Sequence, residues 1–309
     1  VTAQTDASGE IAGAVKKSRT LYTGTFEGEE KAERTFNYTS SGANIKSTSI
    51  NTYSNTTDAL LNANTYQGGV TGIAVSTDKL RSMTEYQGFE GEEKIRVSSN
   101  YNFQIGGLKS YTLYTYDAND DTLKSTKTYR AIMNADGSFR GYTLRSHSSY
   151  LGFEGQEKVD KIYNFDATGL SIKTVTKFNY SGTGIGGRLI NSTTTRNTAH
   201  AANPTQEIIA ADAALGSALF KSITWFSGPE DEEKAQATLD YNSAGALKAT
   251  TMFEYADDGR LLNSTVYRRA ATSPTDSFDS ATHVFTQGNS TIRSRSVYTG
   301  LEGEEKIDK

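Results

Sequence analysis

GFEGEEK at residues 88–94 is the stretch that decides the fold, because the chain spells it five times with small changes. The other copies are GTFEGEEK at 24–31, GFEGQEK at 152–158, GPEDEEK at 228–234 and GLEGEEK at 300–306. An active site is built once, whereas a motif copied along a chain marks a repeated structural unit. The lysines that close the copies are 63, 64, 76 and 72 residues apart, which predicts four complete repeats and the beginning of a fifth.

Composition indicates an all-β chain with thin packing and much polar surface. Serine and threonine together make up 72 of the 309 residues, and tyrosine (18) outnumbers phenylalanine (13). Threonine, tyrosine and phenylalanine favour the half-buried surface of a strand. Proline, which cannot donate to a strand ladder, occurs only three times.

Alternation within the repeats predicts antiparallel strands joined by tight turns. In SIKTVTKFNY at 171–180, every second residue from Ile172 to Tyr180 shares one face. Aromatic residues recur about every 13–16 residues, and turns rich in Gly, Asp, Asn and Ser separate them. We therefore expect an all-β fold: a repetitive antiparallel meander of hairpins, solenoid-like or a sandwich, with about four strands per 63–76-residue repeat.

The spacing of the motif also predicts how the chain is divided. We expect an N-terminal lead-in at 1–20 that can serve as an intersubunit strand, repeats at 21–84, 85–148, 149–222 and 223–296, and a truncated fifth repeat at 297–309. The third repeat carries an alanine-rich insertion at 200–217, opened by Pro204, which favours a short helix or an excursion loop.

A shorter pattern inside the repeats, Tyr-x-Phe/Tyr-Asp/Asn-x-x-Gly-x-Leu, resembles the YD repeat of the RHS family. The best matches are YNFDATGL at 163–170, YNSAGAL at 241–247 and YADDGRL at 255–261. The resemblance implies long antiparallel β-strips, which in that family curl into shells, often around a toxin, or lie on cell surfaces. It therefore also implies that this chain can be a fragment of a toxin-enclosing shell.

The repeated heptapeptide is expected to form a charged turn. Its glycine allows a positive φ, and its glutamates and lysine stay solvated or pair across strands. A calcium site built from Glu27, Glu29 and Glu30 is the functional alternative, although the adjoining lysine argues against it. The candidate turn residues are Gly28, Glu29, Glu30, Lys31, Gly91, Glu92, Glu93, Lys94, Gly155, Glu157, Lys158, Glu232, Glu233, Lys234, Gly303, Glu304, Glu305 and Lys306.

Aromatic residues beside each heptapeptide are expected to pack as a cross-strand ladder. An alternative is that rows of tyrosine bind sugar rings, as aromatic platforms do. The candidate packing aromatics are Tyr22, Tyr38, Tyr86, Tyr101, Tyr150, Tyr163, Trp225, Tyr241 and Tyr298.

Several classes of function find no support in the sequence. Acidic and basic residues are interspersed, with a net charge of −4, so no basic stripe for nucleic acid exists. No apolar run reaches the roughly 18 residues of a membrane span, and cysteine is absent. His147, His200 and His283 lie far apart and nominate no catalytic centre. We expect no enzymatic activity and no cofactor beyond the calcium alternative.

The two ends of the sequence suggest how the protein acts. SVYTGLEGEEKIDK at 296–309 lacks the aromatic strand that follows the earlier heptapeptides, and a polar lead-in precedes the first one. We expect an extracellular or cell-surface structural subunit, exported after removal of a signal, that forms a filament of identical copies joined head to tail by strand addition. The rival hypothesis is a surface adhesin or glycan-binding repeat module.

Overall fold

The computed structural model describes residues 14–24, 27–74, 78–102, 107–134, 138–182, 187–199, 201, 203–216, 218–269, 277–279 and 284–308. Most of the expected lead-in, residues 1–13, lies outside these ranges. The same holds for His200, His283 and positions 202 and 217 of the insertion.

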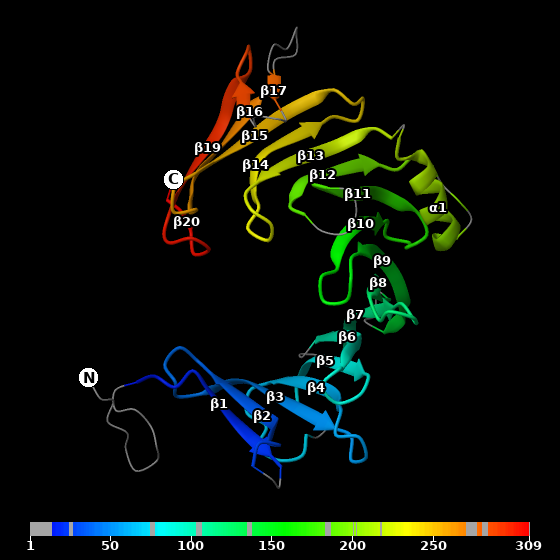
Figure 1. The fold of residues 1–309 in the computed structure, drawn as a ribbon, viewed down its shortest axis with the longest axis vertical. Helices are drawn as coiled ribbons and strands as arrows, with labels where there is room; N and C mark the ends of the chain where they lie inside the picture. Colours follow the sequence, from blue (N-terminus) through cyan, green and yellow to red (C-terminus); the bar gives the residue numbers. More distant parts are fainter. Residues whose placement is uncertain are drawn as a thin grey trace. The chain divides into compact units, whose positions relative to one another are not determined.

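The expectation of an all-β meander is confirmed. Eighteen strands belong to one sheet. Neighbouring strands pair antiparallel along the chain (Figure 1). The chain divides into two units: Val1–Thr115 with Thr128–Thr143, and Tyr116–Lys127 with Leu144–Lys309.

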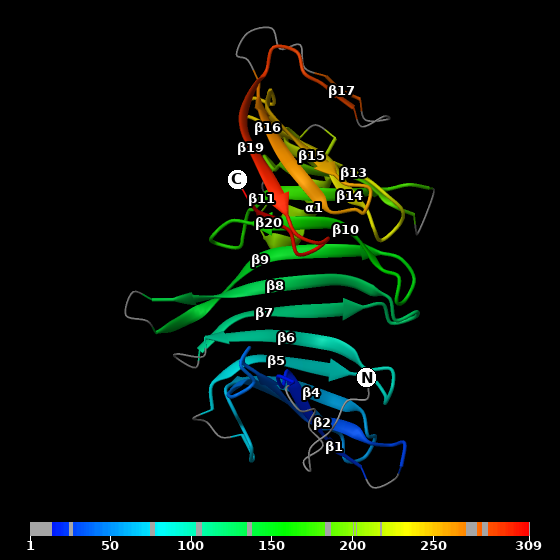
Figure 2. The same cartoon turned by 90° about the vertical axis from the view of Figure 1, so that its left-hand side faces the viewer.

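The first unit is a run of neighbouring strands that follow one another in chain order (Figure 2). Its strands are β1 (Ser18–Thr23), β2 (Lys31–Tyr38), β3 (Ile45–Tyr53), β4 (Leu60–Gln67), β5 (Leu80–Gln87), β6 (Lys94–Asn102) and β7 (Gly107–Tyr116). The outer parts of β8 (Leu123–Met133) and β9 (Phe139–Leu151) also belong to it.

The second unit repeats the same pattern and adds one helix. After β9 its strands are β10 (Lys158–Phe165), β11 (Ile172–Tyr180), β12 (Leu189–Arg196), β13 (Phe220–Ser227), β14 (Lys234–Tyr241), β15 (Leu247–Tyr255), β16 (Leu261–Arg268), β19 (Thr291–Thr299) and β20 (Lys306–Ile307). The strands β17 (Ser277–Asp279) and β18 (Val284–Thr286) form a separate hairpin. The helix α1 (Pro204–Ala214) lies in the insertion of the third repeat and contacts β11.

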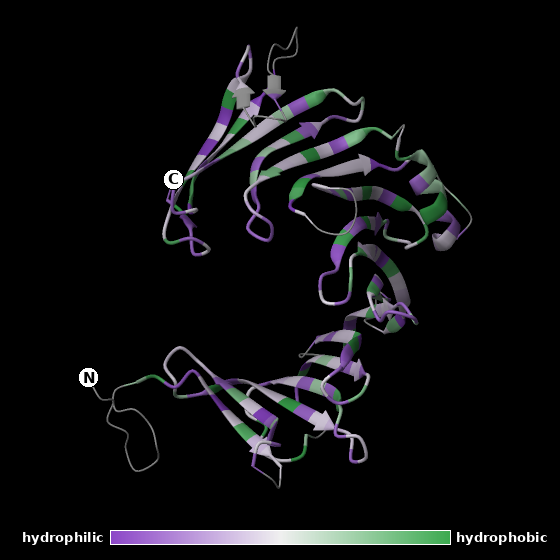
Figure 3. Cartoon of the chain, viewed as in Figure 1, coloured by the Kyte–Doolittle hydropathy of each residue, from purple (hydrophilic) through white to green (hydrophobic). Residues whose placement is uncertain are grey.

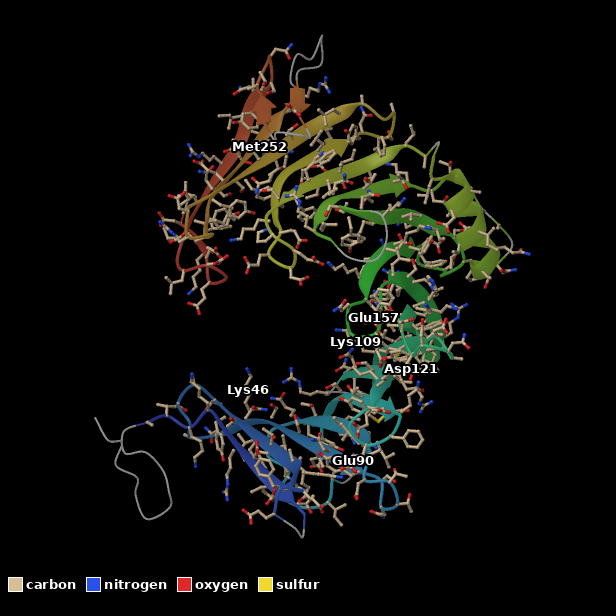
Figure 4. The ribbon with its side chains drawn as sticks, in the orientation of Figure 1. Lys46, Glu90, Lys109, Asp121, Glu157 and Met252 are labelled. Atoms are coloured by element: carbon tan, nitrogen blue, oxygen red, sulfur yellow. The ribbon has the colours of Figure 1, made fainter. Side chains whose placement is uncertain are left out.

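A β-bulge recurs where each tight turn enters the next strand. Tyr38 pairs with Ile45, so Lys46 is the extra residue on β3. Likewise Tyr101 pairs with Leu108, which leaves Lys109 as the extra residue on β7. Both lysines, labelled in Figure 4, are exposed. A bulge adds twist and breaks the strict alternation of faces, so an aromatic residue at the strand end faces two residues of its neighbour.

Cross-strand hydroxyl pairs stabilise the polar face of the sheet. The Oγ1 atoms of Thr176 and Thr194 lie 2.8 Å apart, and those of Thr224 and Thr238 lie 3.0 Å apart. Polar and apolar residues alternate along the strands (Figure 3). Such facing pairs each contribute roughly 0.2–1 kcal/mol, and their polarity explains how a chain of low mean hydropathy still forms a sheet.

The helix α1 supplies the best-buried part of the second unit. Ile172 and Val175 of β11 are 0% and 1% exposed, and Ala211 of the helix is 2% exposed. The helix begins at Asn203, whose side chain accepts the N–H of Gln206 at 3.0 Å, followed by a proline at the first helical position. An insertion in the sequence has thus become the cover of one face of this sheet.

Candidate functional site

The five heptapeptides form hairpin turns between the first and second strand of each repeat, and we number these motifs one to five along the chain. Gly88 (φ +119°) opens the second motif, where a Cβ would stand 2.6 Å from the carbonyl oxygen of Glu92. Gly91 (φ +80°) has open space around it. In the fourth motif Asp231 takes the place of the second glycine, at φ 66°. The turn therefore requires glycine at its first position and a left-handed residue at its second.

The last glutamate of a motif binds the strand that precedes its own hairpin in the sheet. Glu93 of the second motif accepts the backbone N–H of Leu60, with Oε1 2.7 Å from the nitrogen. The same bond joins Glu157 to Leu123 at 2.9 Å, Glu233 to Leu189 at 2.6 Å and Glu305 to Leu261 at 3.0 Å. Each leucine is the first residue of the fourth strand of a repeat, so the glutamate fixes where that strand begins.

The closing lysine of a motif reaches forward to the next motif. Lys31 forms an ion pair with Glu90 at 2.5 Å and donates to the carbonyl oxygen of Asp58 at 2.9 Å. Lys158 makes the same two contacts with Glu230 and Gly187, and Lys234 makes them with Glu302 and Gly259. The accepting carbonyls belong to residues with positive φ in the turn before the fourth strand.

A tyrosine at the end of the third strand completes the arrangement. The hydroxyl of Tyr53 donates to the carbonyl oxygen of Ala32 at 2.9 Å, and Lys31 lies 5.6 Å from the ring centroid. Tyr180 and Tyr255 hold the same places over Lys158 and Lys234, at 5.5 and 5.8 Å. The ammonium group thus faces an aromatic ring, a carboxylate and a carbonyl oxygen, each of which favours its charge.

We refer to this arrangement as a repeat junction. Its preceding side supplies the lysine, the tyrosine and the leucine N–H, and its following side supplies the two glutamates of the next motif. The structure records the full set at three places: Lys31, Tyr53, Leu60, Glu90, Glu93; Lys158, Tyr180, Leu189, Glu230, Glu233; and Lys234, Tyr255, Leu261, Glu302, Glu305. Figure 4 labels Glu90 of the first junction, and Glu157, which binds Leu123.

The junctions shift the pKa values of their members. The hydrogen bond from the Leu60 N–H is the main reason why the pKa of Glu93 is lowered, and the bond from Leu261 does the same for Glu305. The hydrogen bond to Glu90 raises the pKa of Lys31, and that to Glu230 raises the pKa of Lys158. These carboxylates and ammonium groups are stabilised in their charged forms, which suits a structural contact better than acid–base chemistry.

The first motif carries the glutamates of a junction, and the fifth motif carries the lysine of one. In the first motif, Glu30 accepts the N–H of its own Gly28 at 2.9 Å, as Glu93 accepts that of Gly91 at 3.0 Å. Within the described residues, Glu30 has no leucine N–H beside it and Glu27 has no lysine. In the fifth motif Lys306 is exposed and pairs with no carboxylate of the described ranges.

The candidate aromatics differ in burial. Tyr163 is 2% exposed, whereas Tyr22 on β1 is 65% exposed. The others are half-buried: Tyr38, Tyr86, Tyr101, Tyr150, Trp225, Tyr241 and Tyr298. Sequence reasoning placed them beside the motifs but did not assign a role beside lysine to Tyr53, Tyr180 or Tyr255, although Tyr255 opens the match at 255–261. Their shared position, shortly before a Gly/Asp turn and a leucine, is the signal that could have found them.

A polar cleft of about 630 Å³ lies beside the first junction. Glu29, Lys31, Tyr53, Asn55, Asp58 and Glu90 are among the residues that line it. Its lysine is already bound by Glu90, so the cleft offers no unpaired cation. Across the part of the chain that the structure describes, no three His, Asp or Glu side chains gather in a way that could hold a metal ion.

A second polar cluster breaks the repeat pattern beneath α1. Asp212 accepts the hydroxyl of Tyr163 at 2.8 Å and the ammonium group of Lys161 at 3.2 Å. His147 lies with its ring 5.6 Å from that of Tyr163. Burial lowers the pKa of His147 and raises that of Tyr163. The cluster thus joins α1 to β10 through Asp212, with His147 packed against Tyr163.

Comparison with known proteins leaves the family open. No family model matches the sequence, and no curated protein matches it either. The solved structures that match the chain include a porin-like protein from Bacteroides uniformis, which is 10% identical, with 88% of this chain and 94% of that chain covered and a TM-score of 0.28. The toxin complex TcdB2–TccC3 is 12% identical over 97% of this chain and 20% of that one, with a TM-score of 0.23. The chain thus spans about a fifth of TcdB2–TccC3, and likenesses of this size carry no argument about function.

Among the described residues, no helix is both long and apolar enough to cross a membrane. The one described helix of the insertion, α1, has 11 residues.

Proposed function

We propose that the protein is a structural subunit of an extracellular or cell-surface filament, and that copies join head to tail by adding β-strands to one another's sheets. The observation that carries this proposal is the recurrence of the repeat junction. Leu60, Leu189 and Leu261 each bind a glutamate of the following motif in the same way. A contact that joins one repeat to the next inside a chain can join repeats of two chains equally well.

The edge of the first unit is suited to such addition. β1 is paired with β2 on one side, and its side chains are largely exposed, with Tyr22 at 65% and Leu21 at 36%. A strand that adds to this edge gains main-chain hydrogen bonds and covers the two side chains. Glu27 and Glu30, in the turn that follows β1, are placed to receive a lysine and a leucine N–H from the added repeat.

Electron microscopy and sedimentation velocity of the purified 309-residue chain test the proposal. We expect filaments whose abundance rises with protein concentration. We expect removal of residues 1–20, which takes away half of β1, to reduce assembly strongly. A chain that stays monomeric at every concentration would overturn the proposal, as would unimpaired assembly after this removal.

A second candidate function, glycan binding by a surface adhesin, rests on an aromatic cluster in the first unit. The rings of Tyr111 and Tyr129 stack with centroids 4.9 Å apart, and Tyr142 meets Tyr111 edge-on at 5.0 Å. Phe139 and Tyr142 are 54% and 42% exposed. Exposed rings of this kind can stack on the apolar faces of sugars. Saturable glycan binding by a soluble monomer, abolished by Tyr142→Ala and retained by Tyr22→Ala, would favour this function.

The YD-repeat resemblance leaves a third function as a proposal, a fragment of a toxin-enclosing shell. Its support is confined to the short sequence matches at 163–170, 241–247 and 255–261. A shell fragment predicts closed particles rather than filaments. Electron microscopy of the same sample therefore separates the two.

A further inference from the structure

The first and last hairpins of the described sheet are close copies of each other. SRTLYTG at 18–24 matches SRSVYTG at 294–300, and EGEEK closes both hairpins at 27–31 and 302–306. The internal counterparts at the same place read RSMTEYQG, RSHSSYLG and KSITWFSG. Both turns also close alike, because a Cβ on Gly24 would meet the Glu29 carbonyl at 3.0 Å and one on Gly300 the Glu304 carbonyl at 2.8 Å.

The last hairpin, β19–β20, occupies one side of β16. Asn263 pairs with Val297 and Ser264 with Ser296 in the strand register. The hydroxyl groups of Ser264 and Tyr298 lie 3.3 Å apart. The turn of this hairpin adds the two junction glutamates, Glu305 on the N–H of Leu261 and Glu302 on Lys234.

Apart from the two glutamate contacts, the hairpin is held by the pairing of β19 with β16, which runs from Asn263–Val297 to Arg268–Thr291. β20 has only two residues, which pair with the end of β19. Most of β19 is exposed, and Ile292 and Ile307 are 57% and 66% exposed. By contrast, β2 pairs with both β1 and β3 along most of its length. The β1–β2 hairpin therefore presents the same contact groups on a firmly held support.

Each contact group of the last hairpin has a counterpart in the first hairpin. Tyr22 corresponds to Tyr298, Glu27 to Glu302 and Glu30 to Glu305. Tyr22 is 65% exposed, and the Oε2 atom of Glu30 is held by Gly28 at 2.9 Å in the way that prepares Glu93 for Leu60. The three groups thus correspond to those with which the last hairpin contacts Leu261, Lys234 and Ser264.

We propose that copies of the chain join by hairpin exchange: the β1–β2 hairpin of one copy displaces β19–β20 from β16 of another. Leu261 then binds Glu30 of the incoming copy, Lys234 binds its Glu27 and Ser264 meets its Tyr22. The sheet continues without a change of register from β16 into the incoming β1, β2 and β3. The inference rests on the proposed head-to-tail filament and names the surfaces that form its contact.

In hairpin exchange, the β19–β20 hairpin of one copy competes with the β1–β2 hairpin of another copy for pairing with β16. The hairpin is tethered to β16 and so has a high effective concentration there, while the incoming hairpin depends on protein concentration. Weakening the tethered hairpin favours the polymer, and weakening the incoming hairpin disfavours it. Simple addition of strands to free edges predicts no gain from weakening β19–β20.

Two double variants of the full chain test this competition. Glu302→Ala with Glu305→Ala removes the junction contacts of the tethered hairpin, and Glu27→Ala with Glu30→Ala removes those of the incoming one. We expect the first pair to lower the concentration needed for assembly by roughly tenfold, and the second to raise it by a similar factor. Equal shifts in one direction would overturn hairpin exchange.

Disulfide trapping reports the contact directly, because the natural chain has no cysteine. In the exchanged register Ser264 faces Thr20, which corresponds to Ser296. Facing residues of antiparallel strands have Cα atoms about 4.5–5.5 Å apart, within reach of a disulfide. We expect the oxidised Thr20→Cys, Ser264→Cys chain to give a ladder of covalent multimers. As a matched control, Ser264→Cys with Ser296→Cys should yield cross-linked monomers.

The outcomes separate the two proposals. Filaments that form without the covalent ladder would overturn hairpin exchange and leave the head-to-tail filament standing. Absence of filaments from the unsubstituted chain at every concentration would overturn the proposed function itself. A ladder together with opposite shifts in the two double variants supports both.

Discussion

Glu93 accepts the backbone N–H of Leu60, 33 residues earlier in the chain, across an Oε1–N distance of 2.7 Å. The bond connects the turn of one repeat to the first residue of the last strand of the repeat before it. It recurs at Leu123, Leu189 and Leu261. The same glutamate–leucine bond thus recurs along the molecule. It fixes the residue at which the fourth strand of each repeat starts.

Substitution of Glu93 is therefore expected to destabilise the first unit. Glu93→Ala leaves the Leu60 N–H without its acceptor, at a cost of about 1 kcal/mol for this half-exposed group. Chemical denaturation measures the change in the free energy of unfolding. Glu92→Ala is the matched control, because the neighbouring side chain is exposed and should change stability little. Equal losses in both variants would show that the bond to Leu60 has no special role.

The two glycines of the second motif should respond differently to substitution. Gly88→Ala combines φ +119° with a Cβ 2.6 Å from the Glu92 carbonyl oxygen, so we expect a loss of about 1–3 kcal/mol. Gly91→Asp should cost less, because Gly91 has open space and Asp231 holds the equivalent position at φ 66° in the fourth motif. Thermal and urea unfolding of both variants check the ranking. The reverse order would contradict this account of the turn.

Much of this fold follows from local signals in the sequence. The glycine-bearing heptapeptide marks turns, and the alternation in SIKTVTKFNY marks a strand, as β11 confirms. The bulges were missed because the residue that Lys46 or Lys109 adds to its strand looks like any other alternating position. The bonds of Glu93 and Glu157 were missed for another reason. They join strand ends that are far apart in sequence, and only the register of the folded sheet brings those ends together.

The insertion shows the limit of sequence reasoning more sharply. Its proline and its alanine-rich composition favour a short helix, and α1 is present. Nothing local indicates that Glu207 will be fully buried, because a carboxylate on a polar helix is normally solvated. Its burial depends on backbone N–H groups of Ile172 and Ala201 that the folded sheet and loop bring to it.

Acid should weaken the junctions when their glutamates become protonated. The pKa of Glu93 and that of Glu305 lie below their ordinary value of 4.5, mainly because of the leucine N–H bonds. A lowered carboxyl pKa contributes stability that is present above the unfolded-state pKa and is lost as pH falls through the folded-state pKa. We expect the free energy of unfolding to decline below about pH 4.5. Glu93→Gln should flatten this decline, and an unchanged slope would contradict the assignment.

The buried carboxylate under α1 should be among the most sensitive single positions of the second unit. Glu207 is 0% exposed and accepts the N–H groups of Ile172 at 2.9 Å and Ala201, and the side-chain amide of Asn197 at 3.1 Å. Glu207→Ala leaves these buried donors without an acceptor, so we expect the free energy of unfolding to fall by about 3 kcal/mol. Hydrogen exchange at Ile172 would show the local opening. Glu207→Gln keeps one oxygen acceptor and should lose less, and an equal loss would point to charge rather than to hydrogen bonding.

Protonation of His147 should loosen the contact between β9, β10 and α1. Burial lowers the pKa of this imidazole below its ordinary 6.5, Lys127 lowers it further, and Asp212 partly offsets both. Its Nδ1 atom is buried and has no hydrogen-bond partner within the described residues. The unfolded chain therefore takes up a proton more readily than the folded chain, and stability should fall as pH drops through 6.5 towards the lower folded-state value.

His147→Gln removes this pH dependence, so comparison of the unfolding free energies of the variant and the natural chain between pH 5 and 8 isolates it. The NMR signal that disappears in the variant identifies His147, and a pKa at or above 6.5 for that signal would contradict the burial argument.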